Sequence, residues 1–163
     1  MNKLIAILCL ALLVFTGCGA AAGKTGVAAK SGQPKKITFD KETKEDYAKI
    51  TITNNGHKLT FALNDSAAAK ALVEQLPMTV DVKNFSDNEK LFYPNKKLPK
   101  KAPTALAKRG TLACFTPWGN LTIFYKDYGN GTDSDLIELG HVVEGEEYIE
   151  KLEGKLMIEA VKK

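Results

Sequence analysis

Few residues of this chain are of the types that catalyse reactions or bind metals, and they are widely spaced. The two histidines, His57 and His141, have no cysteine or second histidine at the spacing of metal ligands. Neither accompanies the Gly-x-Ser-x-Gly turn of a serine hydrolase. Asp127, Asp133 and Asp135 flank a Gly-Asn-Gly sequence but lack the ligand positions of an EF-hand calcium loop. We therefore predict no metal site and no cofactor, and interpret the acidic group as a solvated loop.

The cysteine with a predicted chemical role is Cys18, which follows a hydrophobic leader. Lys3 precedes an apolar run over residues 4–15, which is too short to span a bilayer and is typical of a signal peptide. The sequence Phe-Thr-Gly before Cys18 resembles the bacterial lipobox, in which the leader is cleaved before the cysteine and the thiol is acylated. We expect residues 1–17 to be the signal peptide. Cys18 would then hold the chain on a membrane, its predicted partner, on the extracytoplasmic side of the bacterial cell envelope.

Composition divides the rest of the chain into a tether and one domain. Residues 18–36 are mainly small and polar and have too few large apolar side chains to offset the entropy of ordering. Residues 37–163 have the length of a single domain with one core. The formal net charge of +4 comes from scattered lysines, so we predict a solvated surface and no nucleic-acid binding. Cys114 lies in an apolar run and is expected to be a small buried hydrophobe.

The clearest candidate for a binding surface is the sequence Phe-Thr-Pro-Trp-Gly-Asn-Leu-Thr-Ile-Phe-Tyr at residues 115–125. The proline fixes its φ angle and the glycine permits a positive one, so a turn places Trp118 beside a β-prone segment. Trp118 is therefore either part of the core or the wall of an aromatic groove for a peptide, a protein segment or a small molecule. For His141, the alternative to a place in the groove is a structural role. The predicted groove candidates are Phe92, Tyr93, Phe115, Trp118, Tyr125 and His141.

Hydrophobic periodicity predicts a mainly β domain with two short helices. Alternating segments on either side of an Asn-Asn-Gly turn predict a hairpin over residues 50–63. Residues 84–107, rich in Asn, Lys and Pro, predict a long surface loop. Helices are predicted at residues 67–75 and 146–152, and further strands at 78–82, 111–115, 121–126, 136–139, 142–143 and 156–161. We expect a mostly antiparallel sheet that is able to close into a barrel.

Several strings of residues resemble those of the cyclophilin-like fold, a closed eight-stranded barrel capped by two helices. The segment after Gly56 resembles the opening hairpin and first helix of cyclophilins, and the segment from Gly140 to Gly145 resembles their late strand and second helix. The resemblance is closer to a bacterial family of small cyclophilin-like domains. The pattern of that family is matched by Leu76-Pro77, Glu89-Lys90, Tyr93-Pro94, residues 117–125 and Leu139-Gly-His141. The resemblance implies a cyclophilin-like closed β-barrel for the whole domain.

The resemblance does not extend to the residues of prolyl isomerisation. Cyclophilins use an arginine in a Phe-His-Arg segment after the first helix, and that segment is absent here. The only arginine, Arg109, lies before a later strand, and His141 does not align with the catalytic histidine. We therefore name no catalytic residue and predict a binding domain. The alternatives are a peptidyl-prolyl cis-trans isomerase that assists envelope protein folding and a purely structural module. Glu89 and Lys90 are interpreted as a surface ion pair.

Overall fold

The structure, a computed structural model, describes residues 48–129 and 131–162. The predicted signal peptide (1–17), Cys18 and the tether (18–36) lie outside the described residues. The described residues fall within one compact unit. None of the helices in these ranges is long and apolar enough to cross a membrane.

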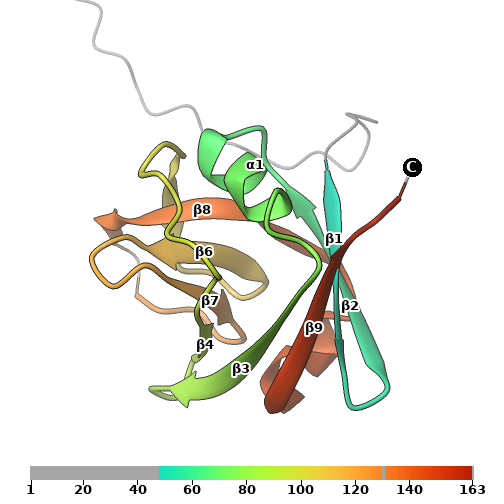
Figure 1. Cartoon of the computed structure of the whole chain (residues 1–163). Coiled ribbons are helices and arrows are strands. Elements are labelled where there is room, and N and C mark those ends of the chain that lie inside the picture. Colours follow the sequence, from blue (N-terminus) through green and yellow to red (C-terminus); the bar gives the residue numbers. More distant parts are fainter. Residues whose placement is uncertain (1–47, 130, 163) are drawn as a thin grey trace, which may run out of the picture. The chain divides into compact units, whose positions relative to one another are not determined.

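Eight antiparallel strands close into a barrel, and a ninth strand pairs with it from outside (Figure 1). The strands are β1 (Lys49–Asn54), β2 (His57–Leu63), β3 (Met78–Phe85), β4 (Glu89–Phe92), β5 (Thr104–Leu106), β6 (Thr111–Phe115), β7 (Asn120–Phe124), β8 (Thr132–Glu144) and β9 (Gly154–Ala160). Around the barrel they follow the order β2-β1-β9-β3-β4-β7-β6-β8, and β8 pairs with β2 to close the ring. β5 pairs with β8 alone. The prediction of a mainly β, closed barrel of about eight strands is confirmed.

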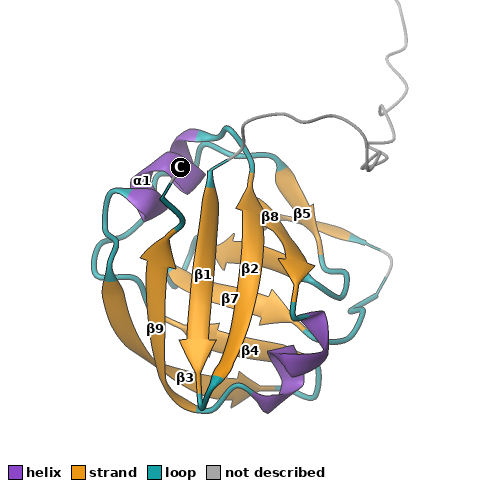
Figure 2. Ribbon diagram, turned by 90° about the vertical axis from the view of Figure 1, so that its right-hand side faces the viewer, coloured by secondary structure: helices purple, strands orange, loops and turns teal. Residues whose placement is uncertain are grey.

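The barrel has two walls whose strands run in different directions. Figure 2 shows β1, β2 and β9 in front of β4 and β7, which cross behind them. Because side chains alternate along a strand, each wall directs every second residue inward. Large apolar side chains from both walls fill the interior, among them Ile52, Phe61, Leu121, Ile123 and Ile158. The interior is therefore a packed core rather than a channel.

The predicted hairpin is confirmed. β1 and β2 pair with Asn54 opposite His57. The two residues between them, Asn55 and Gly56, have φ angles of 49° and 80°, as a two-residue type I′ turn requires. Asn54 also fixes the hairpin to its neighbour, because its Nδ2 donates hydrogen bonds to the carbonyl oxygens of Glu153 (2.7 Å) and Lys155 (2.9 Å).

Two short helices lie at opposite ends of the barrel (Figure 2). The first, α1 (Ala67–Val73), begins after Ser66, whose Oγ accepts a hydrogen bond from the backbone N–H of Ala69 at 3.1 Å. Such a cap satisfies one of the unpaired donors of the first turn. The second, η1 (Glu146–Lys151), is a 3-10 helix that buries Ile149. Both predicted helices are present, and the second is tighter than an α-helix.

The prediction of one long loop over residues 84–107 is wrong. This segment contains all of β4 and β5. β4 is held between β3 and β7, where Leu91 lies opposite Lys83 and Thr122. Its Phe92 is buried in the barrel core. Pairing with strands that are distant in sequence therefore outweighs a local composition of Asn, Lys and Pro, which is why composition alone failed.

One long strand replaces the two short strands that were predicted near the C-terminus. β8 has 13 residues and pairs in turn with β5, β6 and β2. Gly140 makes the last of these pairings possible. A Cβ at this position would lie 2.1 Å from the carbonyl oxygen of Ala62 and 2.8 Å from the Cα of Leu63. The barrel closes only because this position has no side chain.

We expect Gly140→Ala to destabilise the barrel strongly. The added Cβ meets backbone atoms of β2, which cannot rotate away, so the free energy of unfolding should fall by about 3 kcal/mol. The midpoint of thermal unfolding, measured by circular dichroism, should fall by about 10 °C. Gly131→Ala is the matched control, because a Cβ there has no atom within 4 Å. Equal melting of the two variants would contradict this account of closure.

Candidate functional site

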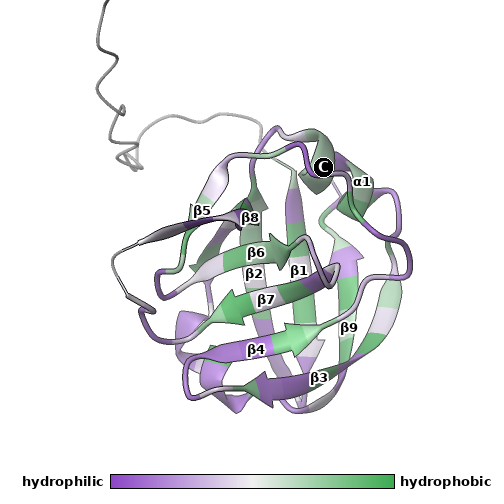
Figure 3. Ribbon diagram, turned by 90° about the vertical axis from the view of Figure 1, so that its left-hand side faces the viewer, coloured by the Kyte–Doolittle hydropathy of each residue, from purple (hydrophilic) through white to green (hydrophobic). Residues whose placement is uncertain are grey.

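A pocket of about 440 Å³ lies on the outside of the barrel, over β4, β7 and β6. Figure 3 faces these strands, which run side by side between β3 and β8. Five aromatic side chains line the pocket: Phe85, Phe115, Trp118, Phe124 and Tyr128. Its volume lies within the range of about 300–1,000 Å³ that is typical of small-molecule sites. The pocket is therefore large enough to enclose a small molecule or one or two side chains of a peptide.

β7 contributes to the pocket and to the barrel core at once. Asn120 and Phe124 line the pocket, whereas Leu121 and Ile123 pack inside the barrel. The pairing of β6 with β7 places Asn120 directly opposite Phe115, so both side chains lie on the same face of the sheet. The pocket floor is thus the outer face of the strands whose inner face forms the core.

The layer outside the barrel supplies one wall of the pocket. Phe124 packs against Ala105 of β5 and against Ala107 and Ala113. Leu136 of β8 is half-buried against the same cluster. This small apolar cluster is separate from the barrel core, and it fixes the position of the pocket wall.

Trp118 stands in the turn between β6 and β7, with 52% of its surface exposed. Its ring centroid lies 5.8 Å from that of Phe85 and 5.4 Å from that of Phe115, with interplanar angles of 82° and 89°. Aromatic pairs favour such edge-to-face contacts. Gly119 has a φ angle of 72°, and its N–H donates to the carbonyl oxygen of Phe115 at 2.8 Å. The turn therefore holds the indole on the pocket wall and not in the barrel core.

Glu89, on β4, is the half-buried carboxylate of the pocket. The hydroxyl of Thr122 on the neighbouring strand donates a hydrogen bond to Glu89 Oε2. Burial raises the pKa of the Glu89 carboxyl above its usual value, and the hydrogen bond from Thr122 partly offsets this rise. The ionised Glu89 carboxylate has therefore lost part of its hydration, and a bound ligand can reduce the free-energy cost of that loss.

Asn120, which lines the pocket, has a side-chain oxygen that is buried and unpaired among the described residues. The residue is 2% exposed, and its Oδ1 has no hydrogen-bond partner among the described residues. Leaving a buried acceptor unpaired costs about 1–3 kcal/mol. A ligand whose N–H or O–H group reaches this oxygen would supply its missing partner.

The structure divides the aromatic residues that we predicted for the groove. Phe115 and Trp118 line the pocket. Phe92 and Tyr125 are buried in the barrel core, on the opposite face of their strands. Tyr93 is exposed beyond the end of β4 and does not line the pocket.

His141 lies on β8, away from the pocket lining, at the point where β8 pairs with both β2 and β6. Its Nε2 is 3.3 Å from Glu138 Oε1, and its Nδ1 is 3.5 Å from the Oγ1 of Thr111. The contact with Thr111 links β8 to β6, whereas Glu138 lies on β8 itself.

Sequence reasoning missed Phe85, Glu89, Asn120 and Tyr128, and of the neighbours Phe124 and Tyr125 it chose the wrong one for the groove. For two of these the signal was present. Phe124 lies next to Tyr125, and the alternation of side chains required that only one of the two face outward. The four-residue turn after Phe115 also sets the register of the hairpin, which places Asn120 beside it. The remaining residues come from segments whose positions only the barrel determines.

The interpretation of Glu89 and Lys90 as a surface ion pair is wrong. Adjacent residues of a strand face opposite sides of the sheet, and Glu89 lines the pocket. Lys90 is buried, with its Nζ 2.6 Å from the Oδ1 of Asn84. Burial lowers the pKa of Lys90, and the charges of two glutamates oppose that change.

Two other residues that were weighed for chemistry, Cys114 and Arg109, lie away from the pocket. Cys114 is buried in the core, and burial raises the pKa of its thiol to about 11, which leaves little of the reactive thiolate at neutral pH. Arg109 pairs with Glu146 on the surface and does not line the pocket. No group of three or more His, Cys, Asp or Glu residues within the described ranges is placed to hold a metal ion.

Comparison with known protein families identifies the barrel. The model of the cyclophilin-like family matches residues 52–159, a range that includes the second half of β1 and all or most of each other strand. This chain belongs to the cyclophilin-like family. The resemblance predicted from the sequence is thereby confirmed.

A solved structure supports the same fold for this cyclophilin-like domain. It is similar to the solution structure of a hypothetical protein from Archaeoglobus fulgidus, with a TM-score of 0.53 and 14% sequence identity. The similarity covers 69% of this chain and 94% of that chain. At this level of identity the likeness extends to the fold alone. A search of curated proteins found no match.

We expect Glu89→Gln to stabilise the fold at pH 7 relative to the parent. The variant keeps an acceptor for Thr122 and removes the buried charge. The pKa of Glu89 is raised in the folded state, so ionisation costs stability above that pKa, and the cost disappears below the unfolded value of about 4.5. The melting temperature of the variant should therefore exceed that of the parent at pH 7, and the two should converge near pH 4. Glu159→Gln, an exposed carboxylate on β9, is the control and should show no such trend.

Proposed function

We propose that this protein is a lipid-anchored, extracytoplasmic binding domain that takes a peptide segment or a small molecule in the aromatic pocket. The observation that carries the proposal is the pocket itself, which combines five aromatic side chains with the unpaired, buried Asn120 Oδ1. Buried apolar walls with a few converging polar atoms are the usual composition of ligand sites. The half-exposed Trp118 leaves apolar surface that a ligand would remove from water.

The composition of the pocket argues against efficient prolyl isomerisation. Rotation about a peptide bond has a barrier of about 18–20 kcal/mol, and lowering it needs a donor placed where charge develops in the transition state. No arginine or lysine is among the described residues that line the pocket. The single arginine, Arg109, is paired with Glu146 elsewhere. The pocket offers binding surface without an evident catalytic donor.

We expect ligands of the pocket to change the fluorescence of Trp118, the only tryptophan of the chain, with no acceleration of prolyl isomerisation. The full chain should be titrated with a panel of peptides and small molecules. It should also be assayed with a proline tetrapeptide in a protease-coupled reaction. Phe85→Ala removes a ring that contacts Trp118 and should weaken a ligand about tenfold.

Tyr93→Ala is the matched control for this experiment, because Tyr93 is an exposed aromatic residue outside the pocket. It should bind the same ligand as the parent does. Acceleration of the slow isomerisation phase that Phe85→Ala abolishes would contradict the proposal and favour the isomerase. Equal effects of both variants on binding would place the ligand outside the pocket.

The proposed anchor is tested separately, since it depends on residues outside the described ranges. Cells that express the parent chain should incorporate labelled palmitate into it, and Cys18→Ser should abolish the label because the acylated thiol is gone. Cys114→Ser is the control and should still be labelled, because that thiol is buried in the barrel. A parent chain that carries no label would refute the anchor and leave the binding function unaffected.

A further inference from the structure

The pocket contains acidic side chains and no basic ones. Glu89 and Asp133 line it, and the described lining residues include no lysine, arginine or histidine. The chain as a whole has the opposite balance, with a formal net charge of +4. The charged residues that line the pocket are thus acidic, although the chain as a whole is basic.

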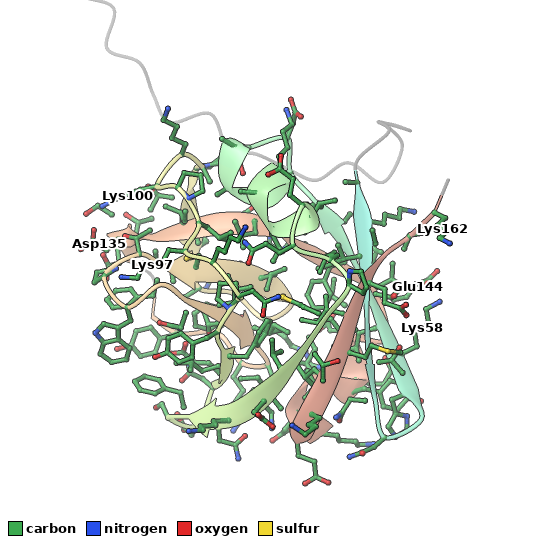
Figure 4. The ribbon with its side chains drawn as sticks, in the orientation of Figure 1. Lys58, Lys97, Lys100, Asp135, Glu144 and Lys162 are labelled. Atoms are coloured by element: carbon green, nitrogen blue, oxygen red, sulfur yellow. The ribbon has the colours of Figure 1, made fainter. Side chains whose placement is uncertain are left out.

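Several basic side chains on this side of the molecule, Lys83 of β3 opposite Leu91 among them, do not line the pocket. Lys100 Nζ binds the carboxylate of Asp135, and Lys108 Nζ lies 3.0 Å from Asp127 Oδ2. Figure 4 shows Lys97 and Lys100 on the same side of the molecule as Asp135. The stem of Lys97 packs over the turn after Trp118, and Lys97 does not line the pocket. The charged side chains that line the pocket are therefore both carboxylates.

Two side chains at the pocket, Asn120 and Glu89, carry oxygens that can accept hydrogen bonds from a ligand. Asn120 Oδ1 is buried and has no partner among the described residues. Glu89 accepts a hydrogen bond from Thr122, which uses one of about four acceptor positions of a carboxylate. The hydroxyl hydrogen of Thr122 is used in that bond and is not offered to a ligand. A ligand that satisfies these atoms must donate hydrogen bonds.

The aromatic walls favour the same ligand. Phe85, Phe115, Trp118, Phe124 and Tyr128 line the same pocket as these acceptors. The faces of such rings attract cations within about 6 Å. A cation with an apolar stem would satisfy the carboxylates, the unpaired oxygen and the apolar walls together. An anion or a hydrogen-bond acceptor would leave Asn120 Oδ1 unpaired and face the charge of Glu89.

We propose that the pocket binds a primary ammonium group on an alkyl stem, the group that a lysine side chain and a free alkylamine share. The ammonium has three donors, which would bind Asn120 Oδ1 and the Glu89 carboxylate, and its stem lies against Leu91 and Phe124. This inference rests on the proposed binding function and names the class of ligand.

The test compares charged and neutral probes of the same shape on the full chain. N-acetyl-lysine methylamide and its norleucine counterpart differ only by the amine, and binding is measured by Trp118 fluorescence and by titration calorimetry. We expect the lysine probe to bind at least about tenfold more tightly. A second comparison sets 1,5-diaminopentane against N-acetyl-lysine methylamide. Tighter binding of the first would indicate a site for a free alkylamine, and tighter binding of the second would indicate a site for a lysine side chain.

Two variants of the pocket should change affinity for the lysine probe in opposite directions. Glu89→Gln keeps the shape and removes the charge, and should weaken binding about tenfold. Asn120→Asp adds a charge at the unpaired oxygen and should strengthen it. Glu159→Gln, which removes an exposed charge from β9, should leave it unchanged. Circular dichroism establishes that each variant is folded, and the opposite signs separate a loss of fold from a loss of charge.

The outcomes distinguish this inference from the binding function on which it rests. If the norleucine probe binds as tightly as the lysine probe and Phe85→Ala weakens both, the pocket binds ligands but the ammonium assignment is wrong. The assignment is also wrong if Asn120→Asp weakens binding of the lysine probe or if Glu89→Gln leaves it unchanged. If no probe or panel member changes Trp118 fluorescence or releases heat, both proposals fall.

Discussion

The pairing of β2 with β8 is the interaction on which the other features of this domain depend. It joins the second strand of the described chain to the eighth. The open sheet thereby becomes a closed ring, in which no barrel strand has an unpaired edge. Backbone atoms of β2 approach Gly140 so closely that no side chain fits between them. Once the ring is closed, every strand has a defined inner face, and the apolar residues on those faces form one core.

Closure also defines the outer faces, and the pocket is built on three of them. The side chains of β4, β7 and β6 that cannot point into the core point together into the pocket. β5 adds a small apolar layer outside the ring and supports one wall. The turn that carries Trp118 projects from the same wall, where Phe85 and Phe115 hold the indole by edge-to-face contacts. The packed core thus holds the strands that carry the pocket residues in place.

The site combines features that stability alone does not favour. Glu89 is a carboxylate in a desolvating environment, Asn120 has a buried oxygen without a partner among the described residues, and Trp118 is half exposed. Each of these raises the free energy of the folded protein. Their occurrence in one pocket, next to a core in which large apolar residues are fully buried, is typical of a surface shaped by binding.

The sequence by itself determined the elements whose signals are local. The hairpin turn at Asn55-Gly56, the Ser66 cap and the alternation of the strands predicted a mainly β domain. Short strings of residues such as those at 117–125 carried the resemblance to its family. Only the tertiary structure decided that β4 is a strand and that Glu89 and Asn120 meet in one pocket. The physical reason is that these features depend on pairing between segments distant in the chain, and a four-residue strand gains its stability from its neighbours rather than from its own residues.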